Sequence, residues 1–389
     1  MRALVAIGLS FAMLPATLLT ALAGGPTTAS WTQFRYGPSH TGFNPHETTL
    51  TPATVGALMP LWQTGPGGVY TDPAVANGLD FLTGRRNGQC SGFEALSAQT
   101  GKVKWSHSLK AFRCTDPAVS GKYVVLLTRN PLRLSVWRAA TGKRVWSATM
   151  PPGRYSSPTV SAGIVYVAAP NGYVMARRVR DGLTHWVVKL HGPLTSEAPA
   201  VTGGRLYITS QSGKVFALGL RHGHVLWTVS SGVPAQTQDA TVAVAGGQLF
   251  VSSNLNTMYA VNLSRHSIAW KSSDIQFTPD FAVAYGLIYV ATAPQGPHGQ
   301  GPNVFALSQQ TGKVQWQFTG GFFASGPEAA GGVLYVSTDG PAGTGTLFAL
   351  NAKTGAKLWS GPGAGSYPSY PAIVNGRVYV NNRCYGLPK

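Results

Sequence analysis

Half of the acidic residues in this strongly basic chain recur at one position of a repeated sequence pattern. The chain has 389 residues, with 30 Lys and Arg against 12 Asp and Glu, and its formal net charge is +18. Six of the acids stand at or near the start of short stretches such as "DPAV" (72–75 and 116–119), "SPTV" (157–160) and "APAV" (198–201). These acids are Asp72, Asp116, Glu197, Asp239, Asp280 and Glu328.

Carboxylates gathered around one point can hold a cation such as Ca²⁺. Their mutual repulsion raises some of their pKa values unless a cation or a hydrogen-bond donor intervenes. The pattern therefore predicts a site for a cationic or hydrogen-bond-donating ligand, if the fold brings the acids together. The alternative is that the six acids cap loop amides and hydrogen-bond to neighbouring repeats.

Signatures of other chemistry are absent from the sequence. It contains no HExxH, GxSxG, P-loop or GxGxxG motif, so no catalytic residue is assigned. The three cysteines, Cys90, Cys114 and Cys384, form no CxxC pair that would indicate a zinc or thioredoxin-type site.

Tryptophan recurs at a spacing of 40 to 46 residues and indicates how the acids are positioned. Eight of the ten tryptophans follow this register: Trp62, Trp105, Trp146, Trp186, Trp227, Trp270, Trp316 and Trp359. Between them lie short β-branched and aromatic runs such as "IVYVAA" and "LIYVAT", bounded by turn residues. Four short strands per period of about 42 residues predict an all-β, eight-bladed β-propeller.

Each blade is expected to have an inner strand A with the "PAV"-like stretch, then strands B and C, and an outer strand D with the tryptophan. The tryptophan is expected to wedge against the neighbouring blade. A glycine stands four residues before it in six blades and suits positive φ in a tight C–D turn, whereas blade five has His266 there.

Because strand A lines the channel, the six acids are expected to form a ring around the channel mouth. Asp72, Asp116 and Asp280 share one offset, and the other three are expected to point away.

The two ends of the chain are expected to close the ring. "GALMPLW" (56–62) offers a lone strand D, and residues 366–386 supply the other strands of an eighth blade. Residues 1–23 read as a secretory signal peptide, with an uncleaved membrane anchor as the alternative. The expected organisation is a signal peptide (1–23), an N-terminal arm (24–56) and the propeller (57–389).

Export would permit disulfide formation. Cys90 is expected in the B–C loop of blade one, and Cys114 follows the connection into blade two, so both should lie on one face. The prediction is a Cys90–Cys114 disulfide, with Cys384 in the closing blade as the competing partner.

The phrases "ALSAQTGKVKW" (95–105), "ALSQQTGKVQW" (306–316) and "ALNAKTGAKLW" (349–359) resemble the tryptophan-docking repeats of the PQQ-like propellers. That family includes pyrroloquinoline quinone (PQQ)-dependent alcohol dehydrogenases and the BamB-type assembly scaffold. The resemblance implies PQQ with Ca²⁺ over the funnel if the chain is a dehydrogenase. The chain lacks the adjacent cysteines and the insertions of many such enzymes, which disfavours that activity.

Basic residues concentrate on the predicted C–D turns and outer strands, opposed there by Glu94 and Asp181. This basic belt includes Lys102, Arg144, Arg177, Arg178, Arg221 and Lys357. It suits either a solvated surface or contact with an anionic envelope polymer or lipid surface. The resulting hypothesis is an exported or periplasmic monomeric scaffold that binds an envelope protein or polymer, without cofactor or nucleic acid. The alternative is a PQQ-dependent oxidoreductase.

Overall fold

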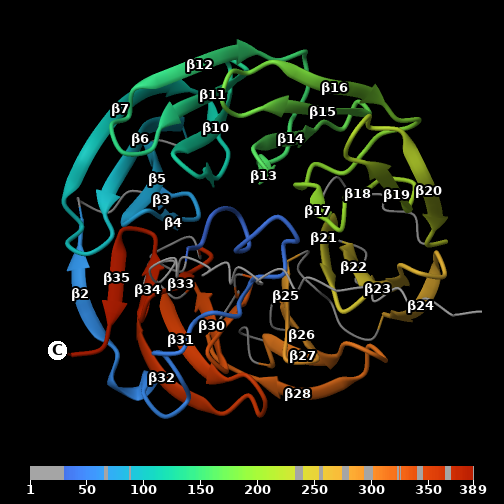
Figure 1. Ribbon diagram of the computed structural model, residues 1–389. Helices are drawn as coiled ribbons and strands as arrows, with labels where there is room; N and C mark the ends of the chain where they lie inside the picture. The colour runs from blue at the N-terminus through green and yellow to red at the C-terminus, as the bar shows by residue number, and fades with distance from the viewer. Residues whose placement is uncertain are drawn as a thin grey trace, which may run out of the picture.

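Eight antiparallel sheets stand in a ring around a central channel in the computed structural model (Figure 1). The structure describes residues 30–64, 69–86, 89–232, 240–253, 257–273, 280–292, 301–321, 324, 326–339, 345–363 and 369–388. The predicted signal peptide lies outside this range. No helix in the described part of the chain is long and apolar enough to cross a bilayer.

The strands follow the order expected for propeller blades, from the channel outward. Blade one comprises β3 (Val69–Tyr70), β4 (Ala74–Ala76), β5 (Leu79–Arg86), β6 (Gln89–Ser97) and β7 (Val103–Ala111). Blade two comprises β8 (Arg113–Cys114), β9 (Ala118–Ser120), β10 (Tyr123–Arg129), β11 (Arg133–Arg138) and β12 (Arg144–Thr149). Blade three comprises β13 (Thr159–Ser161), β14 (Ile164–Ala168), β15 (Tyr173–Arg178) and β16 (Thr184–Lys189). Blade four comprises β17 (Ala200–Thr202), β18 (Arg205–Thr209), β19 (Lys214–Gly219) and β20 (Val225–Ser230). Blade five comprises β21 (Ala240–Ala245), β22 (Gln248–Ser253), β23 (Thr257–Asn262) and β24 (Ser267–Ser272). Blade six comprises β25 (Phe281–Ala284), β26 (Leu287–Ala291), β27 (Val304–Ser308) and β28 (Val314–Phe318).

The last two blades include strands from the N-terminal part of the chain. Blade seven comprises β29 (Glu328–Ala330), β30 (Val333–Thr338), β31 (Thr346–Asn351) and β32 (Lys357–Pro362), with β1 (Phe43–Asn44) parallel to β29. Blade eight comprises β33 (Ala372–Val374), β34 (Arg377–Val380), β35 (Arg383–Gly386) and β2 (Met59–Gln63), which follows a 3₁₀ turn at Val55–Ala57. Antiparallel pairing of β2 with β35 places Trp62 opposite Cys384 and confirms the predicted closure.

The docking tryptophans explain why the turn glycine repeats. The Trp105 indole donates a hydrogen bond to the Ala139 carbonyl of the next blade (2.8 Å). A Cβ at Gly142 would lie 2.7 Å from this ring, and Gly142 also has a φ of +67°. Five other indoles make the same bond across a blade interface: Trp62, Trp146, Trp186, Trp270 and Trp316. Glycine is therefore needed at this position for two reasons. The turn has the positive φ expected from the sequence, and the tryptophan ring of the preceding blade lies too close for a Cβ atom.

Blade five shows what happens without that glycine. His266 has a φ of +50° and stacks on Trp227, with 4.6 Å between ring centroids. Within the described residues the Trp227 indole nitrogen is buried without a hydrogen-bond partner. Ring stacking therefore replaces the hydrogen bond at this interface.

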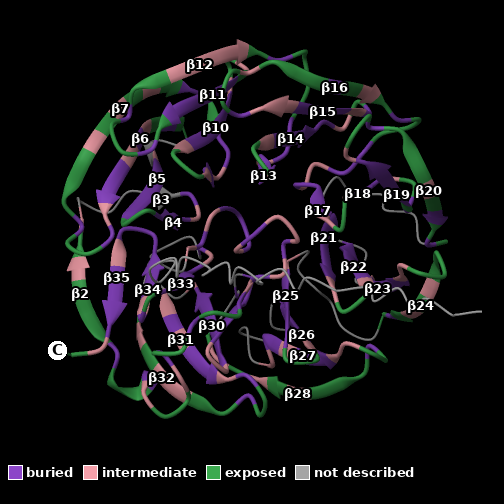
Figure 2. Ribbon diagram, viewed as in Figure 1, coloured by how far each residue is buried: buried purple, intermediate pink, exposed green. Residues whose placement is uncertain are grey.

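Residues 31–44 of the N-terminal arm lie inside the ring, along the channel (dark blue in Figure 1). From residue 31 to residue 44 it hydrogen-bonds in turn to the inner region of each blade, from the first to the eighth. The partners on the blades are Val75, Val119, Val160, Val201, Val244, Val283, Ala329 and Ile373. The inner strands are buried and the outer strands are largely exposed (Figure 2). The arm thus ties all eight blades together.

Candidate functional site

Two of the predicted acids cap loop amides between adjacent blades. The Asp72 amide donates to Asp116 Oδ1 (3.2 Å), and the Ser157 hydroxyl donates to Asp116 Oδ2 (3.0 Å). The Tyr370 amide donates to Asp72 Oδ1 (3.0 Å). These bonds link blades eight, one, two and three at the mouth, so the capping alternative applies to both residues. Asp239 lies outside the described residues.

Asp280 and Glu328 have a different partner, Arg35 of the arm. The Arg35 guanidinium is buried, with Nη1 3.9 Å from Asp280 Oδ1 and the ring centroid of Phe281 5.1 Å from Cζ. Its three nitrogens have no hydrogen-bond partner within the described residues, and neither do the carboxylate oxygens of buried Glu328. A Cβ at Gly42 would clash with Glu328 Oε2 and lie 3.1 Å from Arg35 Nη2, so the two side chains meet beside this glycine. The arm supplies the cation that the acid cluster requires.

Burial dominates the protonation of this cluster. It raises the pKa of Glu328 to about 8, a rise that the Arg35 charge opposes and the Asp280 charge reinforces. It also raises the pKa of Asp72 well above its ordinary value, assisted by the Asp116 charge. Burial and then the Arg35 charge lower the pKa of His40 to about 3, which leaves this imidazole neutral. Near neutral pH the centre therefore holds fewer negative charges than carboxyl groups.

Asp280 accepts further hydrogen bonds around its carboxylate. Thr241 Oγ1 donates to Asp280 Oδ1 (3.1 Å), and the Tyr370 hydroxyl donates to Asp280 Oδ2. Burial, followed by the Asp280 charge, raises the pKa of Tyr370 well above its ordinary value. Tyr370 therefore remains a donor and connects blade eight to blade six across the mouth.

A cavity of about 420 Å³ opens beside this centre and contains charges of both signs. The acids Asp116, Glu197 and Asp280 line it. Three arginines line it as well: Arg113, Arg129 and Arg154. We call it the mouth cavity. Its mixed charge suits a ligand that carries both positive and negative groups.

The expectation that Glu197 and Glu328 point away from the mouth is wrong. Glu197 shares the mouth cavity with Asp116 and Asp280, and Glu328 is buried beside Arg35. Offset along strand A is a poor guide here because the loops before the inner strands differ from blade to blade. No sequence motif marks Arg35 as a site residue. The one indication was that a ring of acids needs a cation nearby.

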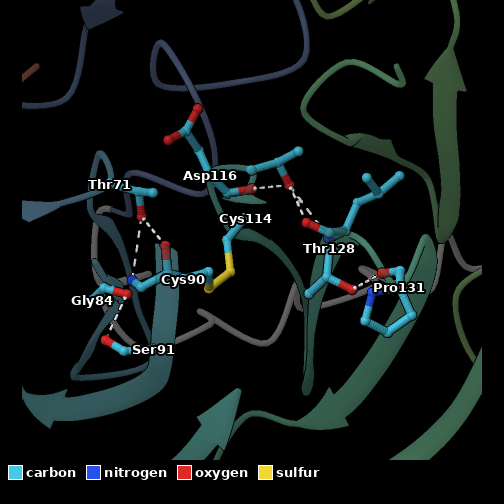
Figure 3. The surroundings of a disulfide bond; sticks show 11 residues. Thr71, Gly84, Cys90, Ser91, Cys114, Asp116, Thr128 and Pro131 are labelled. Carbon is cyan, nitrogen blue, oxygen red and sulfur yellow. Dashed lines mark hydrogen bonds between the residues drawn. A yellow bond between two sulfur atoms is a disulfide. The ribbon is translucent and has the colours of Figure 1, made fainter. Parts of the chain in front are cut away.

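The predicted disulfide joins β6 to β8 next to the mouth cavity. Cys90 and Cys114 are bonded with their Cα atoms 5.6 Å apart, while Cys384 is free and buried in β35. Cys90 lies within strand C of blade one, not in the B–C loop that the sequence suggested. Figure 3 shows the Asp116 carboxylate two residues beyond Cys114, pointing away from the disulfide. The crosslink fixes the backbone from which the cavity wall is built.

The mouth is not arranged as a calcium site with bound PQQ. Within the described residues, no three His, Cys, Asp or Glu side chains are grouped so that they could hold a metal ion. Arg35 lies where a cation would meet Asp280 and Glu328. Asp116, Glu197 and Asp280 share the mouth cavity with three arginines instead of being grouped around one point as Ca²⁺ ligands. The described residues therefore do not form the set of ligands needed for the Ca²⁺ that would accompany PQQ.

Comparisons with known proteins agree with the propeller architecture. The structure is similar to a quinohemoprotein alcohol dehydrogenase from Comamonas testosteroni, with a TM-score of 0.71, 14% identity, and coverage of 93% of this chain and 78% of that chain. It is also similar to BamB from Moraxella catarrhalis, with a TM-score of 0.66, 16% identity, and coverage of 84% and 96%. At these identities the likeness shows the fold alone. A search of curated proteins gives no match.

A family model gives a closer assignment. The model described as outer membrane protein assembly factor BamB matches residues 94–318 and 300–387. The matched segments contain seven of the eight docking tryptophans, from Trp105 to Trp359. The chain therefore belongs to the BamB-type family of PQQ-like β-propellers.

Proposed function

We propose that the protein is an exported binding propeller that holds an envelope protein partner at the mouth of its channel. One observation carries this proposal: the chain's own arm runs along the channel, and residues of the blades beside it line an open, mixed-charge cavity of about 420 Å³. Concave sites with a few convergent polar groups are where propellers and other folds bind ligands. The cavity is thus the best candidate site among the described residues.

The chemistry of the mouth cavity favours a polypeptide partner. The mouth cavity presents the carboxylates of Asp116 and Glu197 to a partner together with the guanidinium groups of Arg113 and Arg154. Complementary charges of both signs give specificity and fix the orientation of a protein partner. Membership of a family named for outer membrane protein assembly supports the same kind of partner.

An extracytoplasmic location is part of the proposal. It rests on the predicted signal peptide (1–23) and on the Cys90–Cys114 disulfide, since such bonds persist in oxidising compartments. The monomer is expected to expose its basic belt to the anionic polymers or lipids of the envelope. Lys102 and Arg221 in C–D turns and Arg144 at the start of β12 are exposed. The outer strands are largely exposed as well (Figure 2).

A PQQ-dependent oxidoreductase is the second candidate. The fold likeness to the Comamonas testosteroni quinohemoprotein alcohol dehydrogenase favours it. The internal Arg35 and the lack of fit described above count against it. Titration with PQQ and Ca²⁺, followed by dye-linked alcohol oxidation, separates the two candidates, because a scaffold gives neither a tight quinone complex nor turnover.

Matched charge variants test the scaffold proposal. The tagged protein is isolated from its own cell envelope as wild type, as Asp116→Asn/Glu197→Gln, and as Glu94→Gln/Asp181→Asn. The last variant makes the same charge change on the outer strands and C–D turns. We expect one stoichiometric partner with the wild type and the control, and at least about tenfold less with the mouth variant. Equal recovery with all three proteins would refute binding at the mouth.

A further inference from the structure

A second cavity, of about 610 Å³, adjoins the mouth cavity on the loop face of blades two and three. The residues that matter for its chemistry are Phe112, Arg113, Arg129, Leu132, Met150 and Arg154. We call it the Arg/Phe groove. Its three arginines also line the mouth cavity, so the two cavities meet at this cationic boundary. The groove itself has no acidic lining residue among those described.

Two of the arginines in the groove face each other across a pair of strands. Arg113 on β8 is directly opposite Arg129 on β10 in the antiparallel ladder. Like charges in directly opposed positions destabilise a sheet. Arg129 is fixed by a bond from its Nη2 to the Tyr155 carbonyl (2.6 Å), and Arg154 is the residue before that tyrosine. The pairing thus concentrates positive charge at one place in the groove.

Apolar surface accompanies this charge. The Phe112 side chain is 52% exposed, and the Arg113 guanidinium lies 5.7 Å from its ring centroid. Met150 is buried at 3% exposure and forms part of the lining with Leu132. The Phe112 amide donates to the Arg129 carbonyl (2.9 Å), and the disulfide at Cys114 restrains the same segment. The aromatic ring is therefore exposed on a backbone that is already ordered.

We propose that the Arg/Phe groove binds an extended acidic peptide segment that also carries an apolar side chain. Guanidinium groups bind carboxylates through paired, charge-assisted hydrogen bonds. Arginine and aromatic residues are the types that dominate binding energy at protein interfaces. The proposal rests on the proposed function and specifies the chemistry of the partner: acidic groups on the three arginines, with an apolar group against Phe112 and Met150.

A flat anionic surface fits this groove less well than a peptide does. The groove is a cavity between loops, whereas lipid headgroups and cell-wall polymers would meet the exposed outer strands first. Such a surface also provides no apolar side chain for Phe112. Binding of an anionic surface is therefore expected at the basic belt, where Arg221 and Lys357 are exposed.

Peptide binding measured by fluorescence anisotropy tests the proposal in 0.15 M salt. The probe is a labelled peptide with the central sequence Asp-Glu-Phe-Asp-Glu. Its controls replace the acids by Asn and Gln, or the Phe by Ala. We expect saturable binding of the probe below about 0.1 mM and at least about tenfold weaker binding of each control peptide.

Protein variants locate the binding on the surface. Arg113→Gln/Arg154→Gln and Phe112→Ser should each weaken binding of the probe at least about tenfold. The control variant Arg221→Gln/Lys357→Gln removes the same amount of charge from the basic belt. It should change the affinity for the probe by no more than about twofold. No saturable binding, equal binding of all three peptides, or an equal loss with the belt variant would overturn the proposal. Preference for vesicles of anionic phospholipid, unaffected by Phe112→Ser, would also overturn it.

The outcomes distinguish this proposal from the broader one. If the envelope partner depends on Asp116 and Glu197 but the acidic peptide does not bind, the groove proposal fails and the scaffold proposal stands. If the peptide binds at the groove but no partner depends on the mouth acids, the scaffold proposal fails in its stated form.

Discussion

The guanidinium of Arg35 lies 3.9 Å from the carboxylate of Asp280, although the two residues are far apart in the sequence. Arg35 belongs to the N-terminal arm, and Asp280 precedes the inner strand of blade six. The contact fastens the arm to the mouth of the channel. It also means that the chain neutralises part of its own acid ring.

Removing Arg35 should expose the energetic role of this contact. Arg35→Met leaves Asp280 without its buried counter-charge and should destabilise the fold by roughly 3 kcal/mol. In the double variant Arg35→Met/Asp280→Asn the loss should be smaller than the sum of the two single losses. Urea denaturation of the four proteins measures this coupling. Strict additivity would show that the two groups do not interact.

The stability of the protein should fall as pH rises from about 4.5 to 8. Burial raises the pKa of Glu328 to about 8, so the folded state retains a proton that the unfolded state releases near 4.5. The raised pKa values of Asp72 and Asp80 act in the same direction, whereas the lowered pKa of His40 opposes the trend below about pH 6.5 without outweighing these three carboxyl groups. For each proton that only the folded state retains, the free energy of unfolding falls by about 1.4 kcal/mol per pH unit. Glu328→Gln should therefore flatten the dependence by up to that slope between pH 5 and 7; an unchanged slope in denaturant titrations would contradict the assignment.

The turn glycines offer a paired test of blade packing. Gly142 and Gly163 both have positive φ, at +67° and +75°. A Cβ at Gly142 would lie 2.7 Å from the Trp105 ring, whereas nothing lies within 4 Å of one at Gly163. Gly163→Ala should cost about 1 kcal/mol from backbone strain alone. Gly142→Ala should cost roughly 2 kcal/mol more because Trp105 must move. Equal losses of stability in thermal or urea unfolding would show that contact with the Trp105 ring does not restrict position 142.

The Cys90–Cys114 crosslink should stabilise the first two blades. The disulfide spans 24 residues of sequence, and Cys90→Ala/Cys114→Ala should reduce stability by about 3 kcal/mol. Cys384 is buried, so thiol titration of the wild type should find one reactive group only after unfolding. Peptide mapping that pairs Cys384 with either other cysteine would disprove this connectivity.

The sequence was sufficient to predict the ring but not what fills it. Trp105, Gly142 and their counterparts form a local pattern at a regular spacing, and closure followed from an unpaired strand at each end. The arm has no such pattern, because its partners are mainly backbone amides and carbonyls such as those of Val119 and Val283. Arg35 was one basic residue among 30. The Arg/Phe groove depends on loop conformations and on the alignment of Arg113 with Arg129, which no local pattern encodes.

Site-specific photocrosslinking in the native envelope most directly tests the claim that the partner binds at the channel mouth. A benzophenone amino acid is placed at position 196, where Ser196 lines the mouth cavity, or at position 183, where Leu183 is 57% exposed beside a C–D turn. Position 196 should give one discrete crosslinked protein, and position 183 should not give that product. The same product from position 183 alone, or from both positions equally, would contradict the account.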